Sequence, residues 1–183
     1  MQPGSDEWLS QVGEEIVDPE TPIVDPHHHL WPPGGRMAYD LDDLAADTGS
    51  GHRIVATVFV ECRAAARTDG PDHLRPVGET EFVASSAGQL AAQHPDAPPI
   101  AGIVAHADLT LPAEQLAEVL DAHATAAVGR FVGIRDALSR AVEPEVLRIP
   151  GRYAEDKYLD TAFRSGVAEL GRRGLTYDTW HYH

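Results

Sequence analysis

The stretch Ile23-Val24-Asp25-Pro26-His27-His28-His29-Leu30-Trp31 joins two β-branched residues to an acid, a proline and three consecutive histidines. Alternate side chains of an extended backbone point to the same face, so His27 and His29 share one face and His28 lies on the other. Two imidazoles on one face at a strand end can bind one divalent cation, because imidazole suits zinc, iron, nickel and copper. The alternative interpretation is a solvated histidine-rich turn or an expression scar, although a tag normally lies at a terminus without a β-branched lead-in.

The composition limits the classes of function. A chain of 183 residues fits one domain that buries a sizeable core. Its formal net charge of −15 disfavours nucleic acid and anionic membrane surfaces as partners, because their phosphates would be repelled. Cys62 is the only cysteine, so an internal disulfide is excluded. Residues 1–15 lack the basic and apolar segments of a signal peptide, and no apolar run has the length of a membrane span, so we expect a cytoplasmic protein.

The chain divides into a mobile acidic N-terminal lead-in, residues 1–21, and one domain, residues 22–183. The run at 54–60 is apolar almost throughout, which is typical of a strand covered on both faces. Hydrophobic periodicity predicts strands at 22–25, 54–60, 100–105, 131–134 and 175–180, helices at 40–47, 77–94, 112–127 and 159–173, and a loop at 139–157. Strands that alternate with helices indicate parallel βαβ units.

Polar and charged residues follow every predicted strand. They are Asp25, His27 and His29, then Glu61 and Arg63, then His106 and Asp108, then Arg135 and Asp136, and finally Tyr182 and His183. The carboxyl ends of parallel strands form the rim at which barrels and open α/β sheets bind ligands. Any one of these residues could be a helix cap or a surface residue, but their recurrence on five strands favours a site.

The motif at 25–31 resembles the first-strand Asp-x-His-x-His signature of the amidohydrolase superfamily. It is most similar to the amidohydrolase-related branch of metal-dependent TIM-barrel hydrolases, which includes sugar and dicarboxylate lactonases. Further stretches that carry the resemblance are 57–62, 75–82, 101–109, 129–135 and 174–183. The resemblance therefore extends from about residue 22 to the last residue.

This resemblance implies a parallel (β/α) barrel of the TIM type with its active site on the C-terminal rim, of which the chain holds about five of eight βα units. It implies that His27 and His29 bind a divalent metal, commonly zinc, which polarises a carbonyl and lowers the pKa of a bound water. It gives Arg135, Tyr182 and His183 as substrate-binding residues, with His183 as an alternative further metal ligand. Some lactonases of this branch use no metal, and there the histidine pair polarises the carbonyl directly.

The chain departs from the family in length. A (β/α) barrel takes about 250 residues, and the family places a further histidine on strand six and a catalytic aspartate on strand eight. No residue here matches either position, so we expect no catalytic residue in this chain and a general-base aspartate beyond residue 183.

Several functions remain open from the sequence. The first is ring-opening hydrolysis of a small lactone, or of a related carboxylic ester or amide, which makes a small molecule the expected partner. The alternatives are metal-dependent decarboxylation of an aromatic acid, and an inactive fragment that self-associates through the unpaired edges of an incomplete sheet. A metal-binding module built from His27, His29, His181 and His183 is a further alternative.

Overall fold

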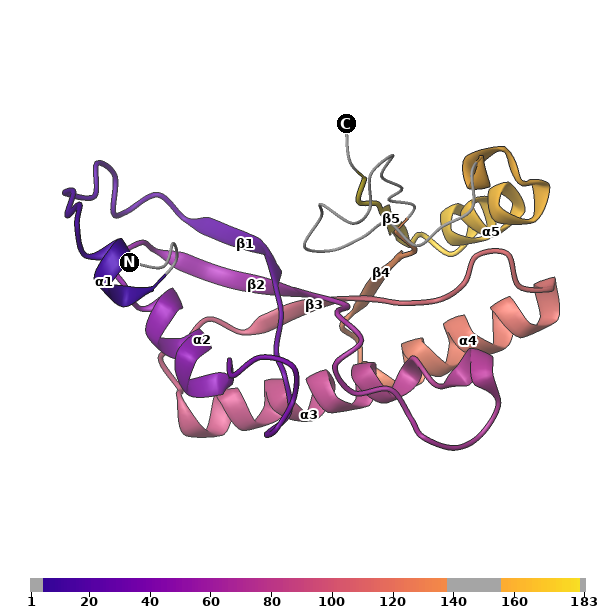
Figure 1. Ribbon diagram of the computed structural model, residues 1–183, viewed down its shortest axis with the longest axis horizontal. Helices are drawn as coiled ribbons and strands as arrows, with labels where there is room; N and C mark the ends of the chain where they lie inside the picture. The colour runs from indigo at the N-terminus through magenta and orange to yellow at the C-terminus, as the bar shows by residue number, and fades with distance from the viewer. Residues whose placement is uncertain (1–4, 138–155, 182–183) are drawn as a thin grey trace.

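Five parallel strands form one sheet in a computed structural model that describes residues 5–137 and 156–181. The strands lie in chain order, β1-β2-β3-β4-β5, and the sheet curls into half of a barrel (Figure 1). Each neighbouring pair runs parallel. The predicted fold class, an incomplete (β/α) barrel of about five units, is therefore confirmed. The loop predicted at 139–157 falls almost entirely outside the described residues.

The elements agree closely with the predicted ranges. The strands are β1 (Ile23–His28), β2 (Ile54–Val60), β3 (Ile100–Ala105), β4 (Phe131–Arg135) and β5 (Thr176–Asp178). The helices are α1 (Asp6–Leu9), α2 (Leu41–Thr48), α3 (Val77–Gln93), α4 (Ala113–Ala126) and α5 (Thr161–Arg172), with short 3-10 turns at Asp72–Leu74 and Lys157–Leu159. The one-turn helix α1 lies within the predicted lead-in. None of the helices in the described residues is long and apolar enough to cross a membrane.

Strand β1 extends three residues beyond its predicted end. It continues through Pro26 to His28, and its register with β2 shifts between Asp25 and His28. A proline cannot donate to the strand ladder, so within sheets it is confined to outer strands and bulges. Because β1 is the outermost strand and is irregular at this point, Pro26 does not end it.

The core lies between the sheet and the helices, which cover its convex face (Figure 1). Phe59, Ile103 and Ile134 supply it from the three central strands, and each is at most 1% exposed. The helices contribute Val83, Leu90, Leu116, Val119, Leu120, Phe163 and Leu170. Full burial of such side chains stabilises the fold by about 1.5–3 kcal/mol each, so this layer fixes the position of the strand ends.

Helix α5 packs against the segment after β3 with no room for a side chain at Gly166. A Cβ atom there would lie 2.3 Å from the Leu109 carbonyl oxygen and 3.0 Å from its Cβ. We expect Gly166→Ala to lower the free energy of unfolding by about 1–3 kcal/mol, measured by urea denaturation, because backbone atoms would have to move. Gly171→Ala in the same helix is the matched control, since nothing lies within 4 Å of that position. Equal effects of the two substitutions would contradict the close packing.

Candidate functional site

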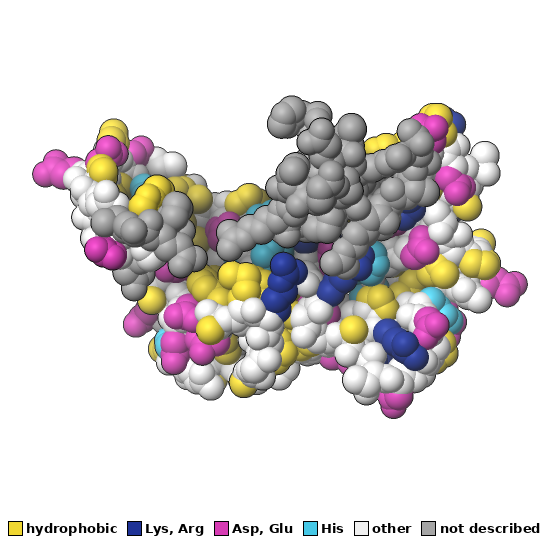
Figure 2. Space-filling model, viewed as in Figure 1, with side chains coloured by type: hydrophobic (Ala, Val, Ile, Leu, Met, Phe, Trp, Pro, Cys, Tyr) yellow, Lys and Arg dark blue, Asp and Glu magenta, His cyan; other side chains and the backbone are white. Residues whose placement is uncertain are grey.

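The predicted histidine pair converges at the end of β1. The Nε2 atoms of His27 and His29 lie 3.2 Å apart, and the two rings stand nearly perpendicular, at 87°. The side chains therefore share one face of the strand end, as the spacing predicts. Figure 2 shows histidine, basic and acidic side chains gathered over the middle of the same sheet.

The neighbouring strand fixes the tautomer of His29. Its Nδ1 lies 2.7 Å from the Val60 carbonyl oxygen, which only accepts, so Nδ1 carries the proton and donates. Burial lowers the pKa of His29, and the nearby charges of His27 and Arg135 act in the same direction. At neutral pH the ring is therefore uncharged, with an unprotonated Nε2 that faces His27.

Asp25 holds the backbone that presents His27. Its Oδ1 accepts a hydrogen bond of 3.0 Å from the backbone amide of His27, so this carboxylate shapes the strand end. His27 itself is exposed, and Nη1 of Arg135 lies 3.4 Å from its Nε2. An arginine has no acceptor, so a hydrogen bond in this contact requires an unprotonated Nε2 on His27.

The guanidinium of Arg135 at the end of β4 is directed mainly at Glu61 at the end of β2. Its Nε donates to Oε1 of Glu61 at 2.8 Å, and its Nη2 donates to the Glu61 backbone carbonyl. The predicted role of Arg135, binding a substrate carboxylate, stays a prediction, but only the Nη1 side of the guanidinium faces the histidine pair. The sequence placed Glu61 at this rim without indicating that it partners Arg135, 74 residues away.

Glu61 is 6% exposed, and its Oε2 is buried without a hydrogen-bond partner among the described residues. The turn after it is fixed by Glu79 of α3, whose Oε1 accepts from the backbone amides of Cys62, at 3.1 Å, and Ala64, at 2.7 Å. Between them Arg63 has φ of 61°, a left-handed conformation that the two bonds stabilise. Burial raises the pKa of Glu79. A carboxylate from a helix thus positions the strand end that carries Glu61.

The Cys62 thiol is not an activated nucleophile. Burial raises its pKa, and the neighbouring Glu79 carboxylate raises it further. Its sulfur lies 3.8 Å from the Leu30 carbonyl oxygen and 3.6 Å from the Glu79 carboxylate. Since the thiolate is the reactive form, the raised pKa disfavours nucleophilic chemistry at this cysteine.

A second polar cluster holds the end of β4. Asp136 is 1% exposed, and its Oδ2 accepts from the Lys157 ammonium at 2.8 Å and from the Leu109 backbone amide at 3.1 Å. Nδ1 of His106 lies 3.0 Å from the Arg135 carbonyl oxygen. Lys157 is the last residue of the predicted loop, so no sequence pattern indicated this contact. This cluster fixes the backbone from which the Arg135 side chain extends.

The remaining predicted residues do not join the pair. His28 lies on the other side of β1, buried, with its Nε2 3.1 Å from the Thr57 hydroxyl. Nδ1 of His181 lies 2.8 Å from the Tyr158 hydroxyl. The predicted substrate contacts Tyr182 and His183 lie outside the described residues, and so does any aspartate beyond residue 183. Within residues 5–137 and 156–181 there is no group of three or more histidine, cysteine or acidic side chains arranged to hold a metal.

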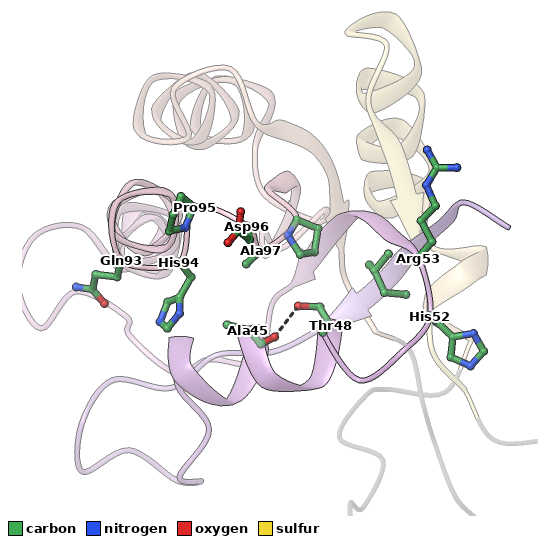
Figure 3. A pocket seen from close by; sticks show the side chains of 12 residues that line it. Ala45, Thr48, His52, Arg53, Gln93, His94, Pro95, Asp96 and Ala97 are labelled. Atoms are coloured by element: carbon green, nitrogen blue, oxygen red, sulfur yellow. Dashed lines mark hydrogen bonds between the residues drawn. The ribbon is translucent and has the colours of Figure 1, made fainter. Parts of the chain in front are cut away.

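A separate pocket of about 480 Å³ lies at the opposite end of the strands, between the last turns of α2 and α3 and the start of β2 (Figure 3). His94 at its edge pairs with Asp42 of α2 at 2.8 Å. In barrels of this type the N-terminal face serves stability, and the C-terminal face carries the chemistry. We therefore place the candidate site at the histidine pair and not in this pocket.

The donor set at the C-terminal rim fits two ligands of a metal ion. Two zinc–nitrogen bonds of about 2.0–2.1 Å at a tetrahedral angle place their nitrogen atoms about 3.3 Å apart. The observed separation of 3.2 Å between the two Nε2 atoms agrees with that spacing. The bond from His29 to the Val60 carbonyl is the outer contact that orients a metal-binding imidazole in many proteins.

Comparisons with known proteins add little to this geometry. No protein-family model matches the chain, and no solved structure matches it. The chain is similar to a curated protein of Sinorhizobium fredii (strain NBRC 101917 / NGR234), named "Uncharacterized protein y4mH", with 28% identity over 190 residues. The match covers 88% of this chain and 54% of that relative, so the chain spans about half the length of the curated protein it matches.

Proposed function

We propose that this chain carries the metal-binding half of the active site of a hydrolase that opens a small lactone or cleaves a related carboxylic ester or amide. The observation that supports the proposal is the convergence of the His27 and His29 Nε2 atoms, 3.2 Å apart, at the C-terminal end of a parallel strand. The resemblance of residues 25–31 to the first-strand signature of the amidohydrolase superfamily supports it independently.

Four residues at the C-terminal rim have a role in this proposal. His27 and His29 hold a divalent cation, with zinc the first choice, which would polarise the substrate carbonyl and activate a water. Val60 keeps the Nε2 of His29 unprotonated, as a ligand must be. Arg135 lies beside His27 and meets a substrate carboxylate through Nη1. The general base is an aspartate that the family supplies from its eighth strand.

The test separates binding from turnover. We expect the zinc-loaded chain to bind the hydroxy acids formed by opening small γ- and δ-lactones, measured by isothermal titration calorimetry, and to lose that binding when zinc is removed or in His27→Ala. We expect no ring opening by the 183-residue chain, followed as proton release, because the proposal places the base outside it. Zinc-sensitive turnover that disappears in His27→Ala would contradict this division of the site.

The second candidate is decarboxylation of an aromatic acid, because related barrels use the same pair of histidines for it. Release of carbon dioxide from hydroxylated benzoic acids, with no binding of opened lactones, would favour it over hydrolysis. The third is a chain without catalytic activity that associates through its outer strands. Analytical ultracentrifugation in the presence and absence of zinc tests that possibility, and a monomer in both would contradict it.

A further inference from the structure

The Arg135–Glu61 ion pair contacts the histidine pair in a way that bears on metal affinity. Arg135 reaches across the rim from β4 and ends 3.4 Å from the His27 Nε2. Because a guanidinium only donates, a hydrogen bond in this contact would use the lone pair of His27 Nε2 that a metal ion needs. The Nε2 of His29 is unprotonated, since its proton lies on Nδ1, so the His27 Nε2 has two alternatives: it donates to His29 at 3.2 Å or accepts from Arg135 at 3.4 Å. The arginine therefore lies where it competes with a cation.

We propose that Arg135, held by Glu61, competes with a divalent cation for His27 and so sets the metal affinity of the histidine pair. The inference rests on the proposed function only in taking the two histidines as metal ligands. It adds a role to two residues that the sequence placed at the rim without connecting them.

The charges explain why two residues are needed. A guanidinium beside the pair repels a divalent cation, and the repulsion is strong because the side chains of Arg135 and Glu61 are only 13% and 8% exposed. Glu61 offsets that repulsion and, through Nε and Nη2, anchors the arginine so that Nη1 points at His27. Removal of Arg135 should raise metal affinity, whereas neutralising Glu61 alone should lower it, because the arginine then keeps an uncompensated charge.

The experiment is a titration of the full chain with zinc chloride at pH 7.5 by calorimetry, with the thermal midpoint as a second readout. We expect Arg135→Gln to bind zinc roughly ten- to hundredfold more tightly than the wild-type chain, and Glu61→Gln to bind it more weakly by a similar factor. Arg135→Lys keeps a charge for Glu61 but cannot hold both partners, so it should fall between Arg135→Gln and the wild type and guards against misfolding of the glutamine variant. Arg172→Gln and Glu169→Gln, an Arg–Glu pair in the last turn of α5, are matched charge controls that should leave affinity unchanged.

Tighter zinc binding in Arg135→Gln has two possible causes: loss of the competing guanidinium, or binding of zinc by the Glu61 carboxylate that the arginine no longer holds. A double variant separates them. In Arg135→Gln alone, the freed Glu61 carboxylate could itself bind zinc. The double variant Arg135→Gln with Glu61→Gln removes that carboxylate, and we expect it still to bind zinc more tightly than the wild type. Affinity at or below the wild-type value in the double variant would overturn the proposal.

The remaining outcomes distinguish this inference from the proposed function. If Arg135→Gln and the wild type bind zinc equally and His27→Ala abolishes binding, the metal site stands and the competition is refuted. If neither Arg135→Gln nor the wild type binds zinc at the histidine pair, the pair is not a metal site even without the arginine. The proposed function and the competition by Arg135 then both fail.

Discussion

Replacing His29 with alanine is expected to weaken zinc binding on the order of a hundredfold or more. The substitution removes one of two convergent ligands and also the contact with the Val60 carbonyl that orients it. Calorimetric titration with zinc chloride measures the effect, and His27→Ala should behave alike. Both variants leave the buried layer beneath the sheet intact, so their denaturation midpoints without metal should stay near the wild-type value.

The control for this result is an exposed histidine elsewhere in the chain. His52 lies in the turn before β2, and the sequence holds ten histidines that could bind zinc weakly. His52→Ala should therefore bind zinc at the His27–His29 pair with the affinity of the wild-type chain. If all three variants titrate like the wild type, the spacing of the His27 and His29 Nε2 atoms does not reflect a metal site.

Acidification is expected to destabilise the chain strongly between pH 6.5 and pH 4. Burial lowers the pKa of His28 and of His123 from 6.5 to about 4. The unfolded chain therefore binds protons before the folded chain as the pH falls, and the stability present above pH 6.5 is lost through this window. Each histidine contributes about 3 kcal/mol of stability that is lost over the whole window, and about 2 kcal/mol of this is already lost at pH 5.

Urea denaturation at pH 7.5 and pH 5 measures this loss. His123 is fully buried and lies 2.8 Å from the Thr80 hydroxyl and 3.0 Å from the His106 carbonyl oxygen. Glutamine is the chosen replacement because its amide offers a donor and an acceptor and does not titrate. His123→Gln should shrink the difference between the two pH values by about 2 kcal/mol, whereas His52→Gln at an exposed position should leave it unchanged. An unaltered difference in His123→Gln would show that other groups cause the acid sensitivity.

The fold was predictable because the strands are short apolar runs between helical periodicities. The bounds of β2 and β3 match the predicted ranges, α3 ends one residue earlier than predicted, and α4 is one residue shorter at each end. A strand that is apolar almost throughout is stable when both of its faces are buried, as they are in a parallel sheet. The extension of β1 was not predictable, because Pro26 signals a strand end unless the strand is known to be outermost and irregular.

The sequence predicted the two histidines of the candidate site, but not the residues that hold them and the neighbouring strand ends in position. His27 and His29 follow from strand alternation, which is a local rule. The pairing of Arg135 with Glu61 depends on how two strands separated by another strand place their ends, and no local rule contains that. Glu79 was unreadable for a related reason: a glutamate in a helix is normally solvated, yet this one is 5% exposed and bonded to backbone amides.

The order of the strands along the chain also gives the site an order of assembly. His29 and the Val60 carbonyl that orients it lie 31 residues apart, on the first two strands, whereas Arg135 follows His27 by 108 residues. At a synthesis rate of roughly 5–20 residues per second, the two imidazoles leave the ribosome about 5–20 seconds before the guanidinium that contacts them. During translation, therefore, the two imidazoles at the end of the first strand are exposed before the arginine that contacts them has been added to the chain.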